Sequence, residues 1–179
     1  MKGDTMKTIK AKPISYDYAR KRKYKDIYYV VFHNTGNVGD TARGNAHYFS
    51  SKGGNQRQAG AHFFAGQEEG DYIKSIPMCR TAWSVGGFFN KANGAGKYYN
   101  KCTNYNSVSI EMCDIVTKDP SKAMIKNLKK ILKHIHRYCP NANTYLRHWD
   151  VNGKSCPKRF TGRNNARWEK LLKELGYKK

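Results

Sequence analysis

The sequence predicts one α/β domain with a mixed central β-sheet flanked by helices. Runs of β-branched and aromatic residues at 26–32, 60–65 and 107–113 are typical of buried strands. Amphipathic runs alternate with them and indicate helices. The 179 residues, 39% hydrophobic and 13% aromatic, exclude a disordered chain and are enough to bury one core. We expect residues 1–25 to form a basic arm of this domain and residues 26–179 its main body, which would hold any functional site.

The composition constrains partners and compartment. The formal charge of +21, from 34 Lys and Arg against 13 Asp and Glu, predicts an anionic partner such as nucleic acid, an acidic lipid surface or a cell-wall polymer. No apolar run approaches the ~20 residues that span a bilayer. The N-terminus lacks the apolar centre of a secretory signal, so we expect synthesis in the cytoplasm.

The five cysteines are an odd number without framework spacing, which argues against a disulfide scaffold and fits a reducing compartment. Cys113 and Cys139 fit inert packing positions. Cys79 and Cys102 flank a glycine-rich insertion, and their pairing stays open.

The first half of the chain supplies three predicted strands and one helix. The cluster Arg20–Lys23 fits a solvated face of the arm. The strand at 26–32 is followed by His33. A site residue at this position would be held by rigid backbone, and the alternative is an ordinary residue at the end of a strand. A helix at 41–50 has Asp40 as its expected N-cap. Its His47 and Tyr48 fit the helix surface or the edge of the core better than a site. A loop follows to residue 55, and strands at 60–65 and 72–76 flank a hairpin at 67–71.

The middle of the chain carries two candidates for a site. His62 fits a hydrogen-bonded core histidine, with support of a site as the alternative. Trp83 fits a groove wall and a core position equally well. The glycine-rich stretch that follows Gly87 and runs to Tyr105 fits a long surface loop. In the strand at 107–113, Val108, Ile110 and Met112 alternate with Glu111, which falls on the opposite face.

The strongest predicted helix begins with Asp119 as N-cap and Pro120 at the first helical position, and it ends at Cys139-Pro140. Its lysine-rich face, with His134 and His136, should be solvated. A closing helix at 164–175 stops at Gly176 and should turn Trp168, Leu171, Leu172 and Leu175 inward. The apolar stripe of the first helix comprises Met124, Leu128, Ile131, Leu132, Ile135 and Tyr138.

The segment His148-Trp-Asp-Val-Asn-Gly-Lys-Ser-Cys156-Pro157 holds two metal-ligand types eight positions apart. Separated by an Asn-Gly turn, the imidazole and the thiolate can close on one zinc ion from a loop. Catalytic zinc usually has three protein ligands, and His33 is the best third candidate. Asp150 fits either an acid that orients a ligand imidazole or a turn cap.

At this point the chain resembles the zinc-dependent N-acetylmuramoyl-L-alanine amidases of the type-2 group. That group includes phage endolysins and bacterial autolysins and is related to the peptidoglycan recognition proteins. The resemblance implies that His33, His148 and Cys156 bind zinc and that Glu111 takes part in catalysis. Ala61 stands where some members carry a catalytic tyrosine, and Ser84 where members often have a histidine. The resemblance to this group rests on five short motifs that occur in the same order as in the family: Val30-Val-Phe-His33-Asn-Thr35, Ala61-His-Phe-Phe64, Ala82-Trp83, Asn106-Ser-Val-Ser-Ile-Glu111-Met-Cys113 and 148–157.

The implied reaction is hydrolysis of the amide between N-acetylmuramic acid and L-alanine in peptidoglycan, by an endolysin or an autolysin that reaches the wall after release. Glu111 would move the proton, Lys154 would donate to the oxyanion, and Trp83 would line the groove. Anionic wall polymers are then the natural counterpart of the charge. A non-catalytic peptidoglycan-binding module is one alternative, although such modules typically lack the cysteine ligand. A basic nucleic-acid-binding protein with structural zinc is the weaker one, since the sequence has no paired ligand knuckle.

Overall fold

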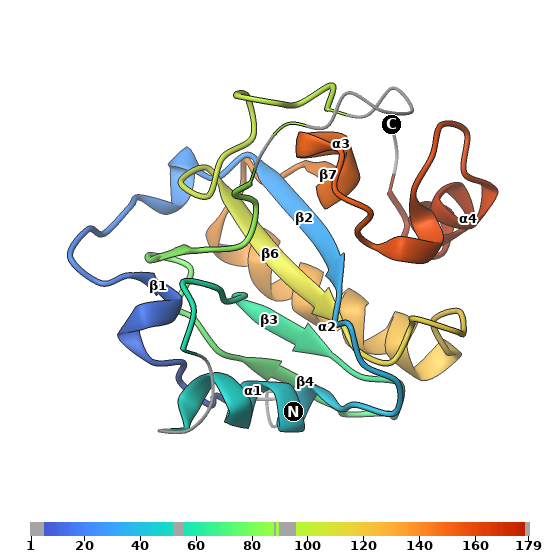
Figure 1. The fold of residues 1–179 in the computed structure, drawn as a ribbon, viewed down its shortest axis with the longest axis horizontal. Coiled ribbons are helices and arrows are strands. Elements are labelled where there is room, and N and C mark those ends of the chain that lie inside the picture. Colours follow the sequence, from blue (N-terminus) through green and yellow to red (C-terminus); the bar gives the residue numbers. More distant parts are fainter. Residues whose placement is uncertain (1–5, 52–55, 88, 90–95, 178–179) are drawn as a thin grey trace.

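A five-stranded sheet forms the centre of the computed structural model, which describes residues 6–51, 56–87, 89 and 96–177. The strand order is β4-β3-β6-β2-β7, with β4 antiparallel to β3 and the other neighbours parallel. The predicted class, a mixed sheet flanked by helices, is confirmed (Figure 1). The strands are β1 (Tyr16–Asp17), β2 (Tyr29–Asn34), β3 (Phe63–Ala65), β4 (Tyr72–Lys74), β5 (Thr81–Ala82), β6 (Ser107–Met112) and β7 (Thr144–Arg147); the α-helices are α1 (Ala42–Ser50), α2 (Lys122–Tyr138), α3 (His148–Asn152) and α4 (Ala166–Glu174); the 3-10 turns are η1 (Pro13–Ser15), η2 (Tyr24–Asp26) and η4 (Lys158–Phe160).

The two central strands separate a large core from the opposite face of the sheet. Alternate residues of β2 and β6, such as Phe32 and Ile110, pack with α2 and α4 in the main core. In Figure 1, α2 lies behind the sheet. The intervening residues, including His33 and Glu111, therefore face away from α2. This confirms the alternation read from 107–113.

The strand β7 was not expected. Four residues are too few for a period of two to stand out, and its pairing with β2 comes only from the fold. The loop predicted for the metal segment is also wrong at its start, because 148–152 form α3. Asp150 accepts from the Arg147 backbone N–H at 2.8 Å and holds its guanidinium at 2.7 and 2.9 Å. These bonds cap a helix too short to show periodicity.

Both predicted helix caps were wrong by one or two residues. Thr41 caps α1 by accepting from the Gly44 N–H at 3.0 Å, while Asp40 accepts from Asn45 and from the backbone of Asp114. Ser121 likewise caps α2. Asp119 instead accepts from the Arg159 side chain at 3.0 Å. Both aspartates contact other parts of the chain instead, and the neighbouring hydroxyl groups of Thr41 and Ser121 cap the helices.

The apolar stripe of α2 is confirmed for five of its six members, which are fully or almost fully buried. Tyr138 is the exception, at 42% exposure. It lies at the end of the helix, where its ring packs against Tyr24 and His134. Asn127, absent from the stripe, is buried because its amide donates to three carbonyls of the turn between β3 and β4. In α4, Trp168, Leu171 and Leu172 are buried, and Asn165 is the cap.

The basic arm holds one buried cation, which contradicts a wholly solvated cluster. Arg22 is only 4% exposed and donates to the carbonyls of Met78, Asn104, Tyr105 and Ser107. Four carbonyl acceptors replace the water that the guanidinium loses. Burial lowers the pKa of Arg22 to about 10. The other cluster members, Arg20, Lys21 and Lys23, are exposed as expected.

The five cysteines are free, so Cys79 and Cys102 are not paired. Burial raises the pKa of Cys113 and of Cys139, in keeping with inert packing positions. Within the described residues, no helix is both long and apolar enough to cross a bilayer. Parts of the predicted loops, 52–55, 88 and 90–95, lie outside the described residues.

Candidate active site

Three candidate site residues stand side by side at the carboxyl ends of the parallel strands. Register pairs His33 of β2 with Glu111 of β6, and it pairs Phe32 with Arg147 of β7. His148 follows Arg147 and begins α3, so it lies beside His33. In α/β sheets, ligands bind at this edge. The strand β7, which the sequence did not reveal, thus delivers the second histidine.

Cys156 reaches the same place on a loop that folds back over α3. Gly153, with φ of 82°, ends α3 in a left-handed conformation. The carbonyl of Cys156 then accepts from the Trp149 N–H at 2.8 Å. Beyond it, the Lys158 N–H donates to the Asn34 side chain at 2.7 Å, which ties the loop to the end of β2.

The structure gathers the three candidate ligands into a compact buried cluster. Nitrogens of His33 and His148 and the sulfur of Cys156 lie within 4.8 Å of one another. The three residues are 2%, 1% and 6% exposed. The Cys156 Sγ is 3.7 Å from His33 Nδ1. Among the described residues, His33 Nε2 and both ring nitrogens of His148 lack a hydrogen bond of ordinary distance and angle, although the Gly86 backbone lies near enough to His148 to raise its pKa against the larger effect of burial. Unpartnered buried polar atoms are rare in proteins and require a ligand, water or ion to explain them.

The protonation states of the two imidazoles agree with a metal site. Burial lowers the pKa of His33 well below its usual value and that of His148 to about 4, so both imidazoles are neutral, as metal ligands must be. Burial raises the pKa of the Cys156 thiol to about 12, and Glu111 adds to this rise. A thiolate here needs a cation beside it, and a coordinated metal supplies one. Two imidazoles and a thiol are a donor set that zinc favours.

Glu111 faces the cluster from β6 in an unusual environment. Its Oε2 is enclosed and has no hydrogen-bond partner among the described residues. Burial raises the pKa of Glu111 to about 7, an effect that Lys154 opposes and Asp40 reinforces. A carboxyl group with a pKa near neutrality can both accept and release a proton at physiological pH.

One open cleft of about 790 Å³ is lined by the three candidate ligands and by three other candidate residues, Glu111, Lys154 and Trp83. Trp83 is half-buried on its wall, which favours the groove reading over core packing. Lys154 is exposed at the rim. A second cavity of about 490 Å³ adjoins the cleft at Glu111 and Phe49 and is lined on its far side by α1. Tyr48, set aside as helix surface, belongs to this second cavity, whereas His47 is exposed and belongs to neither.

Two asparagines that the sequence analysis passed over shape the cleft wall. The Asn104 side chain accepts from the N–H groups of Ser84 and Val85 at 3.0 and 2.7 Å, which fixes the loop after Trp83. Asn152 donates to the Gly86 carbonyl at 3.0 Å and accepts from the Lys154 N–H. Asn104 belongs to no pattern in the sequence that would single it out, and Asn152, at the end of α3, was interpreted only as part of an Asn-Gly turn.

His62 lies beneath the site rather than in it. Its Nε2 lies 2.8 Å from Arg22 Nη2 and 3.0 Å from the Arg80 carbonyl oxygen, and its Nδ1 accepts from the Ser109 backbone N–H at 3.1 Å and lies 3.0 Å from Ser109 Oγ. This supports the hydrogen-bonded core histidine. Asp150 forms the capping bonds already described, which supports its reading as a cap.

Comparison with known proteins agrees with this arrangement. The family model described as N-acetylmuramoyl-L-alanine amidase matches residues 23–159. No match was found among the curated protein sequences. Among solved structures, the chain is similar to PlyL, with 20% identity, a TM-score of 0.67 and 96% of each chain covered. It is also similar to a mutant endolysin from Bacillus subtilis, with 19% identity, a TM-score of 0.64 and coverage of 96% of this chain and 99% of that one. A third is the endolysin amidase LysCS from Clostridium intestinale URNW, with 17% identity, a TM-score of 0.57 and coverage of 98% and 100%.

Proposed function

Because this chain belongs to the N-acetylmuramoyl-L-alanine amidase family, it acts on peptidoglycan, and we propose that it does so as a zinc enzyme. The bond cleaved is the amide between N-acetylmuramic acid and L-alanine. His33, His148 and Cys156 would hold one zinc ion. The similarity to endolysins suggests a lytic enzyme that is made in the cytoplasm and reaches the wall after release.

The buried cluster is the observation that supports this proposal most directly. Three ligand atoms from different elements converge within 4.8 Å, and three imidazole nitrogens there have no partner among the described residues. A purely structural role would leave these atoms desolvated without compensation. When bound, zinc would supply a Lewis acid for the amide carbonyl and for water.

Glu111 is the proposed acid and base. An amide is a poor electrophile with a poor leaving group, so the attacking water must lose a proton and the departing amine must gain one. The Glu111 carboxylate would take the first proton and deliver it to the amine nitrogen. A positioned acid–base group typically contributes ~10²–10⁴-fold in rate.

Lys154 and Trp83 have supporting roles. The Lys154 ammonium at the rim of the cleft would donate to the oxygen that becomes negative during attack, two residues along the chain from a proposed ligand. The Trp83 indole on the wall would lie against the substrate, as aromatic rings do with sugar and peptide surfaces.

Digestion of purified peptidoglycan tests the proposal. New α-amino groups and new reducing sugar ends are measured for the native protein, for protein treated with chelator, and after zinc is restored. We expect alanine amino termini without reducing ends, loss of this activity with chelator and its return with zinc. Binding without new termini would indicate the non-catalytic module, and full activity in chelator would contradict the zinc centre.

A further inference from the structure

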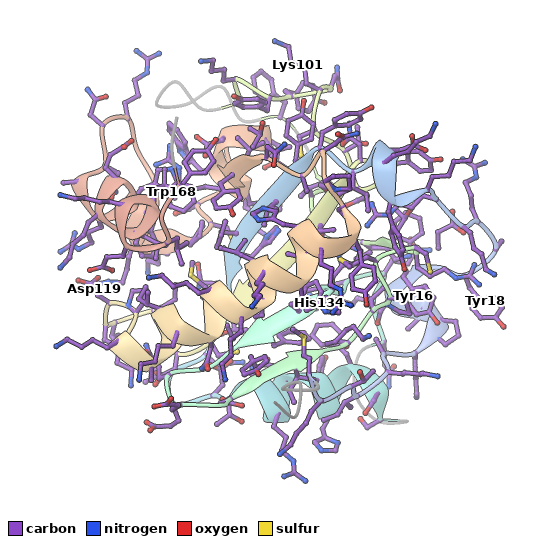
Figure 2. The ribbon with its side chains drawn as sticks, turned by 180° about the vertical axis from the view of Figure 1, so that it is seen from behind. Tyr16, Tyr18, Lys101, Asp119, His134 and Trp168 are labelled. Atoms are coloured by element: carbon purple, nitrogen blue, oxygen red, sulfur yellow. The ribbon has the colours of Figure 1, made fainter. Side chains whose placement is uncertain are left out.

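The outward side of α2 carries cations in a continuous row. We define the basic face of α2 by its six exposed cationic residues, Lys122, Lys126, Lys129, Lys130, Lys133 and Arg137. The helix contains no acidic residue. At 1.5 Å per residue, the face extends for about 22 Å. Figure 2, seen from behind the sheet, shows α2 in front with His134 on it.

This distribution of charge is unlike that of an ordinary solvated helix. The shorter helix α4 mixes Lys170 and Lys173 with Glu169 and Glu174. In α2, like charges recur three and four residues apart, where they repel each other. Lysines near its N-terminus also oppose the helix dipole. An ion pair between Lys126 and Glu69, at 3.3 Å, reduces this repulsion at one position.

Neighbouring elements add to the positive potential. Lys74 of β4 and Arg137 both lie close enough to His134 to lower its pKa, after burial as the larger cause. Lys130 Nζ lies 5.3 Å from the centre of the Tyr72 ring, also on β4. The cationic surface therefore continues from the C-terminal half of α2 onto the edge of the sheet.

We infer that the basic face of α2 is a docking surface for a linear phosphodiester polymer of the cell wall. Charge complementarity supports an extended polyanion, which would meet a row of ammonium groups along its length. Five of the six cations are lysines, which neutralise phosphates as point charges. The guanidinium of Arg137 lies over its neighbour Tyr138. Base-stacking platforms and Arg forks, which nucleic-acid binding favours, are thus sparse on this face.

The position of this surface allows docking and hydrolysis at the same time. α2 packs against one side of the sheet, and Glu111 and His33 face the other side. A polymer bound to α2 would leave the cleft open and would hold the enzyme near its substrate. The choice of a wall polymer rests on the amidase function; the existence of a polyanion surface does not.

Paired charge variants test this inference. The double variant Lys129→Gln/Lys133→Gln removes two charges from the basic face, and the control Lys170→Gln/Lys173→Gln removes two from α4. Lysine and glutamine have similar helix propensity, so both should fold. Binding to poly(glycerol phosphate) is measured across salt concentrations. We expect the α2 variant to bind about tenfold more weakly, with a salt slope lower by about two, and the control to differ less than about twofold.

Three results would overturn the inference: equal losses in both variants, native binding by the α2 variant, or displacement of the polymer by duplex DNA at equal phosphate concentration. Cleavage of a small soluble muramoyl peptide should be unchanged in both variants. Because poly(glycerol phosphate) contains no amide, its binding can be scored even if the native protein cleaves nothing, so failure of the amidase proposal would be seen separately.

Discussion

For single residues, the main cost to stability lies at the ends of β2, β6 and β7, where polar atoms are buried without hydrogen bonds. An enclosed carboxylate oxygen on Glu111 and unpartnered nitrogens on His33 and His148 each carry a desolvation cost. Ordinary buried polar groups here avoid that cost: Asn127 and Arg22 satisfy their donors with backbone carbonyls. This difference supports the interpretation of Glu111, His33 and His148 as parts of one site.

Glu111→Gln should leave zinc bound and reduce turnover by about 10²–10⁴-fold, because the amide keeps the size of the side chain but cannot carry the proton. Zinc content is measured by atomic absorption and turnover by release of alanine amino termini. Glu68→Gln, at an exposed carboxylate of the turn after β3, is the matched control and should keep native turnover. Near-native turnover in the Glu111 variant would assign the proton transfer to another group.

His62 predicts a specific acid sensitivity. Burial, followed by the charge of Arg22, lowers the pKa of His62 well below its ordinary value. Below about pH 6.5 the His62 imidazole is therefore protonated in the unfolded chain but stays neutral in the folded chain. Stability is therefore full above about pH 6.5 and falls as the pH drops below it, by up to about 1.4 kcal/mol per pH unit for this group.

Urea unfolding of metal-free protein at pH 7.5 and pH 5 measures this loss. His62→Gln should reduce the difference in unfolding free energy between the two pH values, because glutamine does not titrate. His47→Gln, at an exposed position, should preserve it. Identical pH dependence in the native protein and the His62 variant would refute the assignment.

At the scale of elements, the start of α2 shows how a local signal is redirected by the fold. Asp119-Pro120-Ser121 offers two residues suited to capping, and the side chain that accepts from Met124 is Ser121, at 3.0 Å. Asp119 lies in ion pairs with Arg159 and Arg167. Ser121 also donates to the Gln67 carbonyl, so the cap joins α2 to the turn after β3.

Ser121→Ala should lower the free energy of unfolding by about 1 kcal/mol, the usual cost of losing an N-cap. Asp119→Ala is the comparison, and it should cost less than about 0.5 kcal/mol, because the Asp119 side chain is 55% exposed in both of its ion pairs. Chemical denaturation of both variants measures the difference. The reverse order of the two losses would restore Asp119 as the cap.

At the scale of the whole molecule, the site joins parts of the chain that are far apart in sequence. His33 and Cys156 are 123 positions apart, and their side chains meet at 3.7 Å. An ion bound between them would act as a cross-link present only in the folded state. Binding energy at such a site adds directly to folding stability.

Zinc should therefore raise the melting temperature of the metal-free protein. At a free zinc concentration ~1,000-fold above its dissociation constant, the gain is about 4 kcal/mol. Calorimetry with and without zinc measures the shift. Cys156→Ser should give a much smaller shift, whereas Cys113→Ser, at a buried cysteine outside the cluster, should respond to zinc as the native protein does. An unchanged melting temperature would contradict zinc binding, whatever the activity.

The elements with a long local signal could be predicted from the residues alone: the buried strands that carry His33 and Glu111, and the apolar stripe of α2. The sequence also supplied the ligand types and, through ordered motifs, the family. Four features became visible only in the folded chain: the strand β7, the burial of Arg22, the residues that cap α1 and α2, and the position of His148 beside His33 and Glu111. Periodicity follows from which side chains recur along a segment, so a segment can show it alone. Strand register, choice of cap and burial of a charge depend on competition among distant partners, and that competition is settled only when the sheet forms.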